Sequence, residues 1–405
     1  MKAFCHGILV VVFLLGPAQL VQAGTFIFAG EANGINSINH PTGYTGVGGT
    51  LTVGVCINAT SANATEMIQP VQNIVAAFNR RQAVAPNLIS GSNNDIGSSE
   101  IDFESVALHE VGHCIGLGHV NAASESGLSG DNRNYTKATV GGDGIFNLND
   151  GADNIIGSAD DIRGDDANLH WFRKTTNNPC AVDSATSDGT TYSRDLADLP
   201  AGETFAANGD RDVCADLGSP TTEAVMQQGS FFDEDQRALT QDGVSTLELA
   251  MSGLNETAGN ADDYTLNLVS HGAVSNPAAN ANCDIIMDFD NSETGFAVCQ
   301  VSGVSVTGTH FRITGANIFF NTGFNWFFNT GICSGAPQTT GTNLNLNNTS
   351  ISDAGRFRAT QTITAGTAFA VTASGCVNFS AGQSIRLEPG FSAAVGSSLH
   401  LSVSP

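Results

Sequence analysis

The clearest chemical pattern in this chain is FESVALHEVGHCIGLGH, which runs from Phe103 to His119. It contains the motif H-E-x-x-H-x-x-G-x-x-H, whose histidines are His109, His113 and His119. His109 and His113 are four residues apart, so a helix places both on one face, where they can bind one metal ion. Gly116 can adopt the left-handed backbone conformation that ends a helix and turns the chain. This turn lets His119 approach the same metal as a third ligand.

The three histidines predict a catalytic zinc site rather than a structural one. Three neutral imidazoles leave the fourth position of a tetrahedral zinc ion open for water, and imidazole nitrogen favours zinc over other metals. Glu110 follows the first ligand and is expected to reach that water without binding the metal. The shorter motif H-E-x-x-H also occurs by chance on ordinary helices, whereas the longer form fixes more positions. Apolar flanking residues such as Val106 and Ile115 fit a helix that lies against a core.

The longer motif resembles the signature of the metzincin metalloproteases. This resemblance implies an α+β catalytic domain in which a twisted sheet carries the active-site helix. It also implies a Met-turn, a tight turn whose methionine packs beneath the metal, and Met226 in the stretch 223–229 is the candidate. An ordinary buried methionine is the alternative for this residue. Residues 237–253 resemble the closing helix of the matrixin branch of the family.

The chain departs from the matrixin pattern at three points. Val120 stands where matrixins usually carry a serine after the third histidine. The interval from His119 to Met226 is 107 residues, far longer than matrixins usually show. No cysteine-switch propeptide precedes the first expected strand. The resemblance therefore implies the metzincin group as a whole more strongly than its matrixin branch.

A metzincin site implies a zinc-dependent endopeptidase that acts on proteins or peptides. Glu110 is then the general base that takes a proton from water and the general acid that passes it to the leaving amine. Metzincins usually bind substrate as an added strand along a sheet edge, and residues 87–90 are the expected edge. Two alternatives remain open. One is a catalytically silent surface or adhesion protein that retains the zinc site, and the other is a zinc hydrolase of a non-peptide substrate.

Residues 1–23 have the pattern of a secretory signal peptide. Lys2 precedes an apolar run from Ile8 to Leu15, and Val21 and Ala23 stand at the positions where signal peptidase needs small residues. The alternative, a membrane anchor, would need a longer apolar run. No stretch after residue 23 is long and apolar enough to be inserted into a membrane, so a secreted or extracellular protein is expected.

The cysteine count agrees with export. Removal of residues 1–23 leaves eight of the nine cysteines, and an even number in an exported chain favours disulfides. The sequence does not determine their connectivity, but neighbouring positions suggest the pairs Cys180–Cys214, Cys283–Cys299 and Cys333–Cys376. None of the eight cysteines has CxxC spacing, which argues against a thiolate metal site.

The catalytic domain is expected to span residues 24–255. Residues 51–57 have strand composition, and apolar residues recur at helical spacing between 67 and 78. Further strands are expected between this helix and the metal helix. Residues 120–222 form an acidic insertion, in which alternating Asp, Asn and Gly are typical of loops that bind calcium. The best candidate ligands are Asp150, Asp153, Asp160 and Asp161, and a solvated acidic loop is the alternative.

Two β-rich segments follow the catalytic domain. Residues 256–345 contain short β-prone runs and are expected to form a separate sandwich-like domain. Their aromatic cluster favours a packed core over a ligand platform; it comprises Phe319, Phe320, Phe324, Trp326, Phe327 and Phe328. Residues 346–405, with GQSIRLEPGF at 382–391, resemble the small stacked-β modules of secreted bacterial proteins known as coat-hanger stacks. This resemblance implies a surface or secretion role for the segment and a bacterial source.

The charge balance excludes some partners. The chain has 39 acidic and 15 basic residues and a formal net charge of −24, which argues against nucleic acid and against electrostatic binding to anionic membranes. Charged residues make up only 13% of the chain and hydrophobic residues 41%, so a globular protein is expected rather than a disordered one. The sequence leaves the oligomeric state open.

Overall fold

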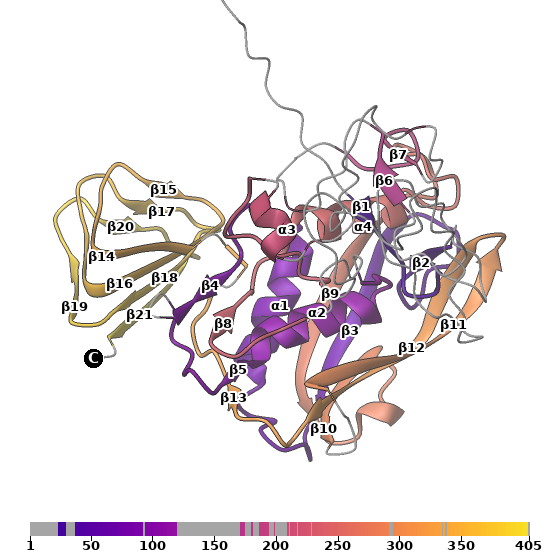
Figure 1. Ribbon diagram of the computed structural model, residues 1–405, viewed down its shortest axis with the longest axis horizontal. Coiled ribbons are helices and arrows are strands. Elements are labelled where there is room, and N and C mark those ends of the chain that lie inside the picture. Colours follow the sequence, from indigo (N-terminus) through magenta and orange to yellow (C-terminus); the bar gives the residue numbers. More distant parts are fainter. Residues whose placement is uncertain are drawn as a thin grey trace, which may run out of the picture.

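The computed structural model describes residues 23–29, 37–91, 94–119, 171–174, 180, 186–193, 198, 209, 211–216, 218–227, 229–290, 295–333, 335–336 and 338–403. The predicted calcium ligands Asp150, Asp153, Asp160 and Asp161 lie outside these residues, as do residues 1–22 of the predicted signal peptide. Mixed β-sheets and a small number of helices make up the architecture, which agrees with the predicted α+β class (Figure 1). No helix in the described part of the chain is long and apolar enough to cross a membrane.

The largest sheet has six strands. They are β2 (Ile38–His40), β3 (Gly49–Asn58), β9 (Tyr264–Val274), β10 (Ile285–Asp290), β11 (Ala297–Thr307) and β12 (His310–Asn321). The order is β11-β12-β10-β3-β9, and β2 also pairs with β12. All neighbouring strands are parallel except β11 and β12, which form an antiparallel hairpin. The described residues between 23 and 333, which surround this sheet, are called the sheet half below.

The composition of this sheet differs from the prediction. The segment 256–345 was expected to form its own domain, but its strands β9, β10 and β12 join β3 and β2 in one sheet. The strands expected just before the metal helix are instead β4 (Ile89–Ser90) and β5 (Ile101–Asp102), which pair with β8 (Glu234–Asp235) and β13 (Trp326–Phe327) outside that sheet. The physical reason is that apolar alternation marks a strand without identifying its neighbour. Burial of β3 and β10 side chains in one core determines the pairing.

Two helices lie on one face of the six-stranded sheet (Figure 1). α1 (Ile68–Arg80) contacts β9 and β3, α2 (Phe103–Cys114) contacts β11 and β12, and the two helices contact each other. The apolar spacing between 67 and 78 therefore predicted α1 correctly. The helix ends at Arg81, which adopts a left-handed φ of 51°. α2 begins after Asp102, whose carboxylate accepts a 2.9 Å hydrogen bond from the Ser105 N–H and so caps the first turn.

An aromatic core joins α2 to the sheet. The ring centroid of Phe103, the first residue of α2, lies 4.6 Å from that of Phe320, 5.1 Å from that of Phe328 and 6.1 Å from that of Trp326. Phe320 is fully buried and Trp326 is 9% exposed. The packed-core interpretation of this cluster is therefore confirmed for these residues, although the core belongs to the six-stranded sheet rather than to a separate sandwich.

A third helix carries a small additional sheet. α4 (Gln241–Met251) starts after Thr240 and contacts β1 (Ala23–Gly24). β1 pairs with β6 (Trp171–Arg173), which pairs with β7 (Tyr192–Ser193). Trp171 and Tyr192 pack against Leu249 of α4 in one apolar cluster. The remaining described helices are α3 (Arg211–Asp216) and the short 3₁₀ helix η5 (Pro277–Ala279).

The C-terminal residues 338–403 form a regular stack of parallel strands, shown in yellow tones in Figure 1 and called the stack below. One sheet contains β14 (Gln338–Leu346), β16 (Ala354–Ala365), β18 (Cys376–Ala381), β19 (Ser384–Leu387) and β21 (Ser398–Val403), and the other contains β15 (Ser350–Ile351), β17 (Ala370–Val371) and β20 (Ser392–Ala393). Ala354 pairs with Cys376 and Cys376 with Ser398, so these rungs follow each other at 22 residues. The interval from β14 to β16 is shorter, because Gln338 pairs with Arg356. The stack begins at residue 338, eight residues before the predicted boundary at 346.

Four disulfides connect these elements. Cys180–Cys214 and Cys333–Cys376 form as predicted. The predicted pair Cys283–Cys299 is wrong, because the structure has Cys56–Cys283 and Cys114–Cys299. β10 lies beside β3 in the sheet, which brings Cys283 to Cys56, while β11 lies against α2, which brings Cys299 to Cys114. Proximity in sequence therefore gave the wrong partners where distant strands are neighbours.

Candidate metal centre

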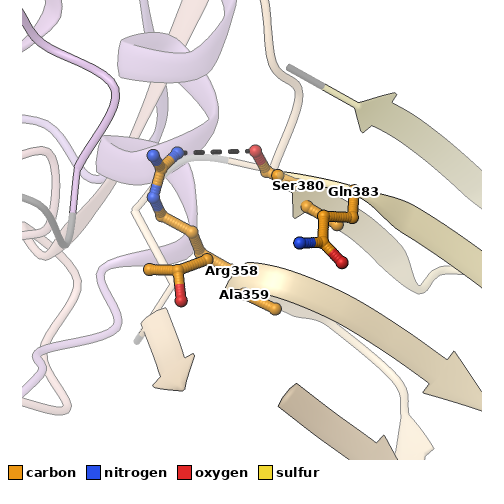
Figure 2. A pocket seen from close by; sticks show the side chains of 7 residues that line it. Arg358, Ala359, Ser380 and Gln383 are labelled. Atoms are coloured by element: carbon orange, nitrogen blue, oxygen red, sulfur yellow. Dashed lines mark hydrogen bonds between the residues drawn. The ribbon is translucent and has the colours of Figure 1, made fainter. Parts of the chain in front are cut away.

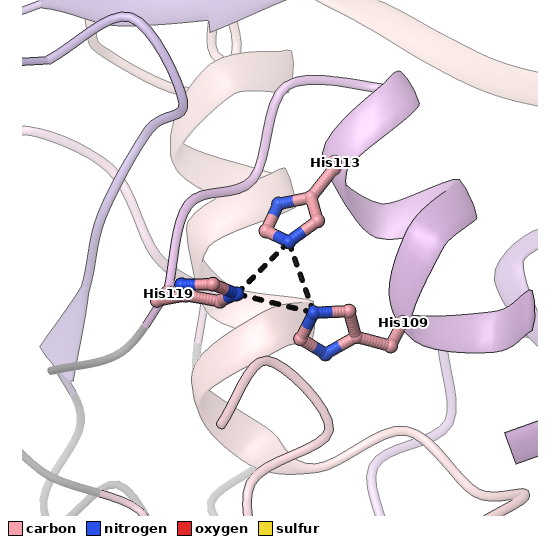
Figure 3. Close-up of side chains that lie close together, drawn as sticks. All are labelled: His109, His113 and His119. Carbon is pink, nitrogen blue, oxygen red and sulfur yellow. Dashed lines mark hydrogen bonds between the residues drawn. The ribbon is translucent and has the colours of Figure 1, made fainter. Parts of the chain in front are cut away.

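Three histidine side chains converge at the C-terminal end of α2 (Figure 3). α2 holds His109 and His113 one turn apart, and the chain then turns through Gly116, which has a φ of +118°. A side chain at this position would approach Asn39, so glycine suits the turn on both counts. His119 follows the turn. Its Nε2 lies 3.1 Å from Nε2 of His113 and 3.2 Å from Nε2 of His109, and the latter two atoms are 2.9 Å apart.

Backbone carbonyls determine which nitrogens face the centre. His109 Nδ1 lies 2.7 Å from the carbonyl oxygen of Val225, and His113 Nδ1 lies 2.8 Å from that of Leu117. A carbonyl oxygen only accepts, so the proton of each neutral imidazole is assigned to Nδ1 and the Nε2 atom carries a lone pair. Hydrogen bonds of this kind orient the histidines of metal sites and raise their basicity as ligands.

The three imidazoles are uncharged in this environment. Burial, as the largest cause, lowers the pKa of His109 and places the pKa of His113 well below its ordinary value, to which its two histidine neighbours also contribute. Burial and the neighbouring His109 lower the pKa of His119 to about 3. Protons therefore compete weakly for these nitrogens at neutral pH, and all three remain available to a cation.

The donor set suits a metal ion. No proton lies between Nε2 of His109 and Nε2 of His113, so the two lone pairs repel each other unless a cation lies between them. A tetrahedral zinc ion with Zn–N bonds of about 2.0–2.1 Å separates its ligand nitrogens by about 3.3 Å. The observed separations of 2.9–3.2 Å are slightly below this value, so a small outward movement would admit the ion.

Glu110 directly follows His109 on α2. Its side chain is 6% exposed, and its Oε2 has no hydrogen-bond partner among the described residues. Burial raises the pKa of Glu110 to about 7, and a hydrogen bond from the Cys299 N–H partly offsets this effect. A buried carboxyl group that titrates near neutrality can both accept and release a proton. The disulfide Cys114–Cys299 holds β11 next to this carboxyl group.

Met226 packs against α2 at Gly112, between His109 and His113 in the chain. A side-chain carbon placed on Gly112, between His109 and His113, would lie 2.4 Å from the Met226 sulfur, so only glycine admits this contact. Met226 is 1% exposed and lies in a tight turn, in which the Gln227 N–H donates to the Ala224 carbonyl at 2.9 Å. Met226 is thus both buried and part of a turn against the helix that carries two of the histidines.

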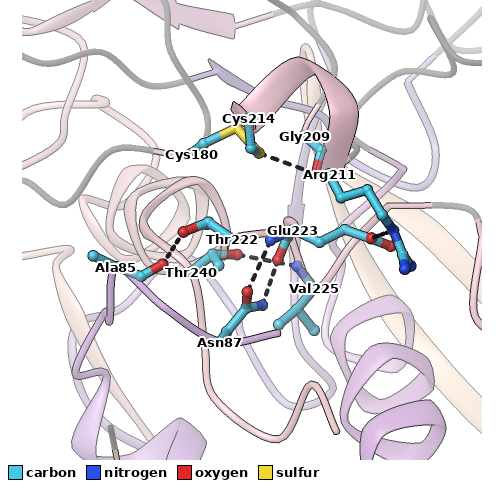
Figure 4. Close-up of a disulfide and its surroundings, with 10 residues drawn as sticks. All are labelled: Ala85, Asn87, Cys180, Gly209, Arg211, Cys214, Thr222, Glu223, Val225 and Thr240. Atoms are coloured by element: carbon cyan, nitrogen blue, oxygen red, sulfur yellow. Dashed lines mark hydrogen bonds and ion pairs between the residues drawn. A yellow bond between two sulfur atoms is a disulfide. The ribbon is translucent and has the colours of Figure 1, made fainter. Parts of the chain in front are cut away.

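The segment before Met226 is held at several points (Figure 4). Asn87 exchanges two hydrogen bonds with the Glu223 backbone, and the Val225 N–H donates to Thr240 Oγ1 at 3.0 Å. Arg211 pairs with the Glu223 carboxylate at 2.7 Å, and the disulfide Cys180–Cys214 lies beside this group. These contacts place the Val225 carbonyl where it accepts from His109.

Several residues around the centre were not identified from the sequence. Cys299 and Val225 contact Glu110 and His109 from segments far away in the chain, and no local pattern marks them. Asp102 does carry a signal, because aspartate is a preferred N-cap residue and here stands immediately before the apolar residues of the helix. The expected substrate edge at residues 87–90 forms β4, which pairs with β8 and is not part of the six-stranded sheet. β11 is instead the strand that ends this sheet beside α2.

Comparison with known protein families, with curated proteins and with solved structures finds no match for this chain. Its chemistry must therefore be inferred from the geometry of the three histidines and Glu110.

Proposed function

We propose that the chain is a zinc-dependent endopeptidase of the metzincin type, which hydrolyses peptide bonds of extended protein segments. The observation that carries this proposal is the convergence of three uncharged Nε2 atoms, 2.9–3.2 Å apart. Glu110 directly follows the first of these histidines on α2, and its buried Oε2 has no hydrogen-bond partner among the described residues. Three histidine nitrogens form the donor set of a catalytic zinc site with one open position for water, and the carboxylate that follows the first ligand supplies the base.

Each side chain then has a defined task. His109, His113 and His119 would hold zinc, which supplies Lewis-acid polarisation of the scissile carbonyl and of the attacking water. Glu110 accepts the proton of that water at Oε2 and delivers it to the nitrogen of the leaving amine. A pKa of about 7 in the metal-free site suits both transfers, since the carboxyl group can lose and regain a proton at neutral pH. Met226 supports the helix turn that carries two of the ligands.

The edge strand β11 is the proposed substrate platform. It ends the six-stranded sheet, contacts α2 and is joined to the metal helix through Cys114–Cys299. An extended peptide that pairs with such an edge gains main-chain hydrogen bonds and is held across the adjacent site. Phe231 and Phe232, 58% and 45% exposed, offer an apolar surface next to this strand, because the Phe232 ring lies 6.0 Å from that of Phe296.

Export and a bacterial source belong to the same proposal. Four disulfides are typical of proteins from oxidising compartments and are rare in the cytosol. The signal-like residues 1–23 and the resemblance of the stack to modules of secreted bacterial proteins support the same assignment.

The test is digestion of an unfolded protein such as reduced casein by the zinc-loaded chain, with cleavage products identified by mass spectrometry. We expect internal cleavage that stops when zinc is removed by a chelator and returns when zinc is restored. Absence of cleavage despite one bound zinc per chain would favour a silent surface protein. Hydrolysis of simple esters or amides without cleavage of any peptide would instead indicate a non-peptide hydrolase, and either result would contradict the proposal.

A further inference from the structure

A buried chain of alternating charges runs from the stack to the first turn of α2. Arg356, on β16, donates to the carboxylate of Asp235 on β8. Asp235 also lies 3.4 Å from Nη1 of Arg237, and Arg237 donates from Nε and Nη2 to the two carboxylate oxygens of Asp102 at 2.8 and 2.6 Å. Asp102 caps α2. All four side chains are 7% exposed or less.

The helix end of this network is tightly connected. Asp102 Oδ2 accepts from both the N–H and the hydroxyl of Ser105, at 2.9 and 2.5 Å. The Gln236 N–H, between Asp235 and Arg237, donates to the same Ser105 hydroxyl at 2.8 Å. The segment from Asp235 to Arg237 is therefore joined to the cap of α2 through both backbone and side chains. Four residues further along α2 comes His109, the first of the three converging histidines.

Within this network two arginines face two aspartates, and the buried Glu104 also acts electrostatically on Arg237. Burial by itself raises the pKa of Asp235, but the guanidinium groups of Arg237 and Arg356 hold it below its ordinary value. If Arg356 is removed, two buried carboxylates share the single cation Arg237. An uncompensated buried charge is costly, so Arg237 would be drawn toward Asp235 and its two hydrogen bonds to Asp102 would weaken.

We propose that Arg356 is a positioning residue for the metal helix, which acts through Asp235 and Arg237 on the Asp102 cap of α2. The stack then stabilises the helix of the metal centre and is not only a surface or secretion module. The effect on peptide hydrolysis rests on the proposed function, whereas the effect on the helix does not.

The same strand supplies a matched control. Arg358, two residues after Arg356 on β16, pairs with Asp95 and donates to Ser380 Oγ at 3.5 Å (Figure 2). Together with Ala359 and Gln383 it lines a hollow on the stack. Among the described residues its ion-pair and hydrogen-bond partners are Asp95 and Ser380, and not Asp235, Arg237 or Asp102. Arg358→Met removes a cationic side chain from the same strand and the same junction but leaves the proposed network intact.

The first experiment measures hydrogen–deuterium exchange of residues 103–114 in the metal-free protein. We expect Arg356→Met to raise the exchange rate in the first turn of α2 about fivefold, which is the effect of losing a helix cap. The zinc dissociation constant should rise by a similar factor. Arg356→Lys should give an intermediate value, because lysine keeps the positive charge but lacks the planar guanidinium group with its several N–H donors. This variant replaces Arg356→Met if Arg356→Met does not fold. Arg358→Met should leave both quantities within twofold. Unchanged exchange in the Arg356 variants, or an equal rise in Arg358→Met, would overturn the proposal.

A double-mutant cycle separates positioning from a general loss of structure. Asp102→Asn weakens the last link of the network while it leaves a side chain that can still cap the helix. If Arg356 acts through Asp102, the double variant should exchange no more than about twofold faster than the stronger single variant. If the fold increase in the double variant equals the product of the two single-variant increases, the residues act independently, and this result would contradict the proposal. A wild-type chain that cleaves no peptide but follows this exchange pattern would refute the proposed function and still support the positioning role of Arg356.

Discussion

The six-stranded sheet and the stack are both built mainly from parallel strands, but they assemble those strands in different ways. In the sheet, Gly49 of β3 pairs with Tyr264 of β9, more than two hundred residues later in the chain. In the stack, Ala354 pairs with Cys376 and Cys376 with Ser398, at a constant interval. The sheet therefore depends on contacts that close very long loops, whereas each rung of the stack needs only the next one.

Three of the four disulfides follow the same division, whereas Cys180–Cys214 in the sheet half spans only 34 residues. Cys56–Cys283 and Cys114–Cys299, which hold the sheet half together, span 227 and 185 residues. Cys333–Cys376, which joins the end of the sheet half to the stack, spans 43 residues. Cross-links contribute most where the loop that they close is long, and here the long ones lie next to the metal helix and the central strand. The metal centre thus lies in the half whose contacts join residues that are farther apart in the sequence.

The difference between the sheet half and the stack can be tested most directly by truncating one large core side chain in each. Phe320 and Phe379 are both fully buried, the first in the sheet core and the second in the stack core. Each Phe→Ala change should cost about 3–5 kcal/mol. Phe320→Ala should lower the unfolding midpoint of the sheet half and weaken zinc binding strongly, because Phe320 packs on the first residue of α2.

Phe379→Ala should instead increase hydrogen–deuterium exchange in β16, β18 and β21. It should shift the unfolding midpoint of the sheet half much less than Phe320→Ala does. Tryptophan fluorescence separates the two, because both tryptophans, Trp171 and Trp326, lie in the sheet half. Equal shifts of the fluorescence midpoint in the two variants would show that the halves unfold as one unit and would remove the distinction.

A second comparison removes one disulfide within the sheet half and, separately, the disulfide that joins this half to the stack. In the chain-entropy description, loss of Cys114–Cys299 should cost about 1 kcal/mol more than loss of Cys333–Cys376, since the stabilisation grows with the logarithm of the loop length. Each loss should lie in the range of about 2–5 kcal/mol. Urea unfolding of Cys114→Ala/Cys299→Ala and of Cys333→Ala/Cys376→Ala checks the order. The reverse order would mean that native contacts, and not loop closure, decide the contribution of each bond.

A smaller effect concerns pH and only the sheet half. Asp242, in the first turn of α4, is fully buried, and burial raises its pKa from 3.8 to about 6. The folded state therefore binds more protons than the unfolded state between these values, so stability falls as the pH rises from about 4 to about 6 and stays lower above pH 6. Asp242→Asn cannot ionise and should be more stable than the wild type above pH 6, by on the order of 2 kcal/mol.

The control is the same pair of proteins at pH 4, where the carboxyl group is protonated and the two stabilities should agree within about 0.5 kcal/mol. Denaturant unfolding followed by tryptophan fluorescence gives both numbers. A difference that does not change with pH would show that ionisation of Asp242 is not its cause.

The two halves also differ in how far the sequence predicted them. Helix periodicity predicted α1, and the histidine spacing predicted the convergence at α2, because in both cases the interacting residues are within one or two turns of each other. Short strands stacked as rungs were likewise expected from the C-terminal residues. These features depend on local geometry, which a sequence pattern records directly.

Partners that are distant in sequence were not predictable in this way. β9, β10 and β12 complete the sheet of β3, although they were expected in another domain. Cys299 lies only sixteen positions after Cys283, yet β12 separates their strands, and each cysteine finds a partner on another element. The buried network from Arg356 to Asp102 was missed for the same reason, since it joins four residues from three separate segments. No local pattern records which strand lies beside which.

The most direct test of the central claim compares the zinc-loaded wild type with Glu110→Gln at equal, measured zinc content. The account predicts that the variant binds one zinc per chain with an affinity close to that of the wild type, because Glu110 is not a ligand, and that it cleaves unfolded casein at least 100-fold more slowly, because no group replaces its proton transfers. Cleavage by Glu110→Gln at the wild-type rate, or a wild type that holds zinc on these histidines and cleaves no peptide bond, would contradict it.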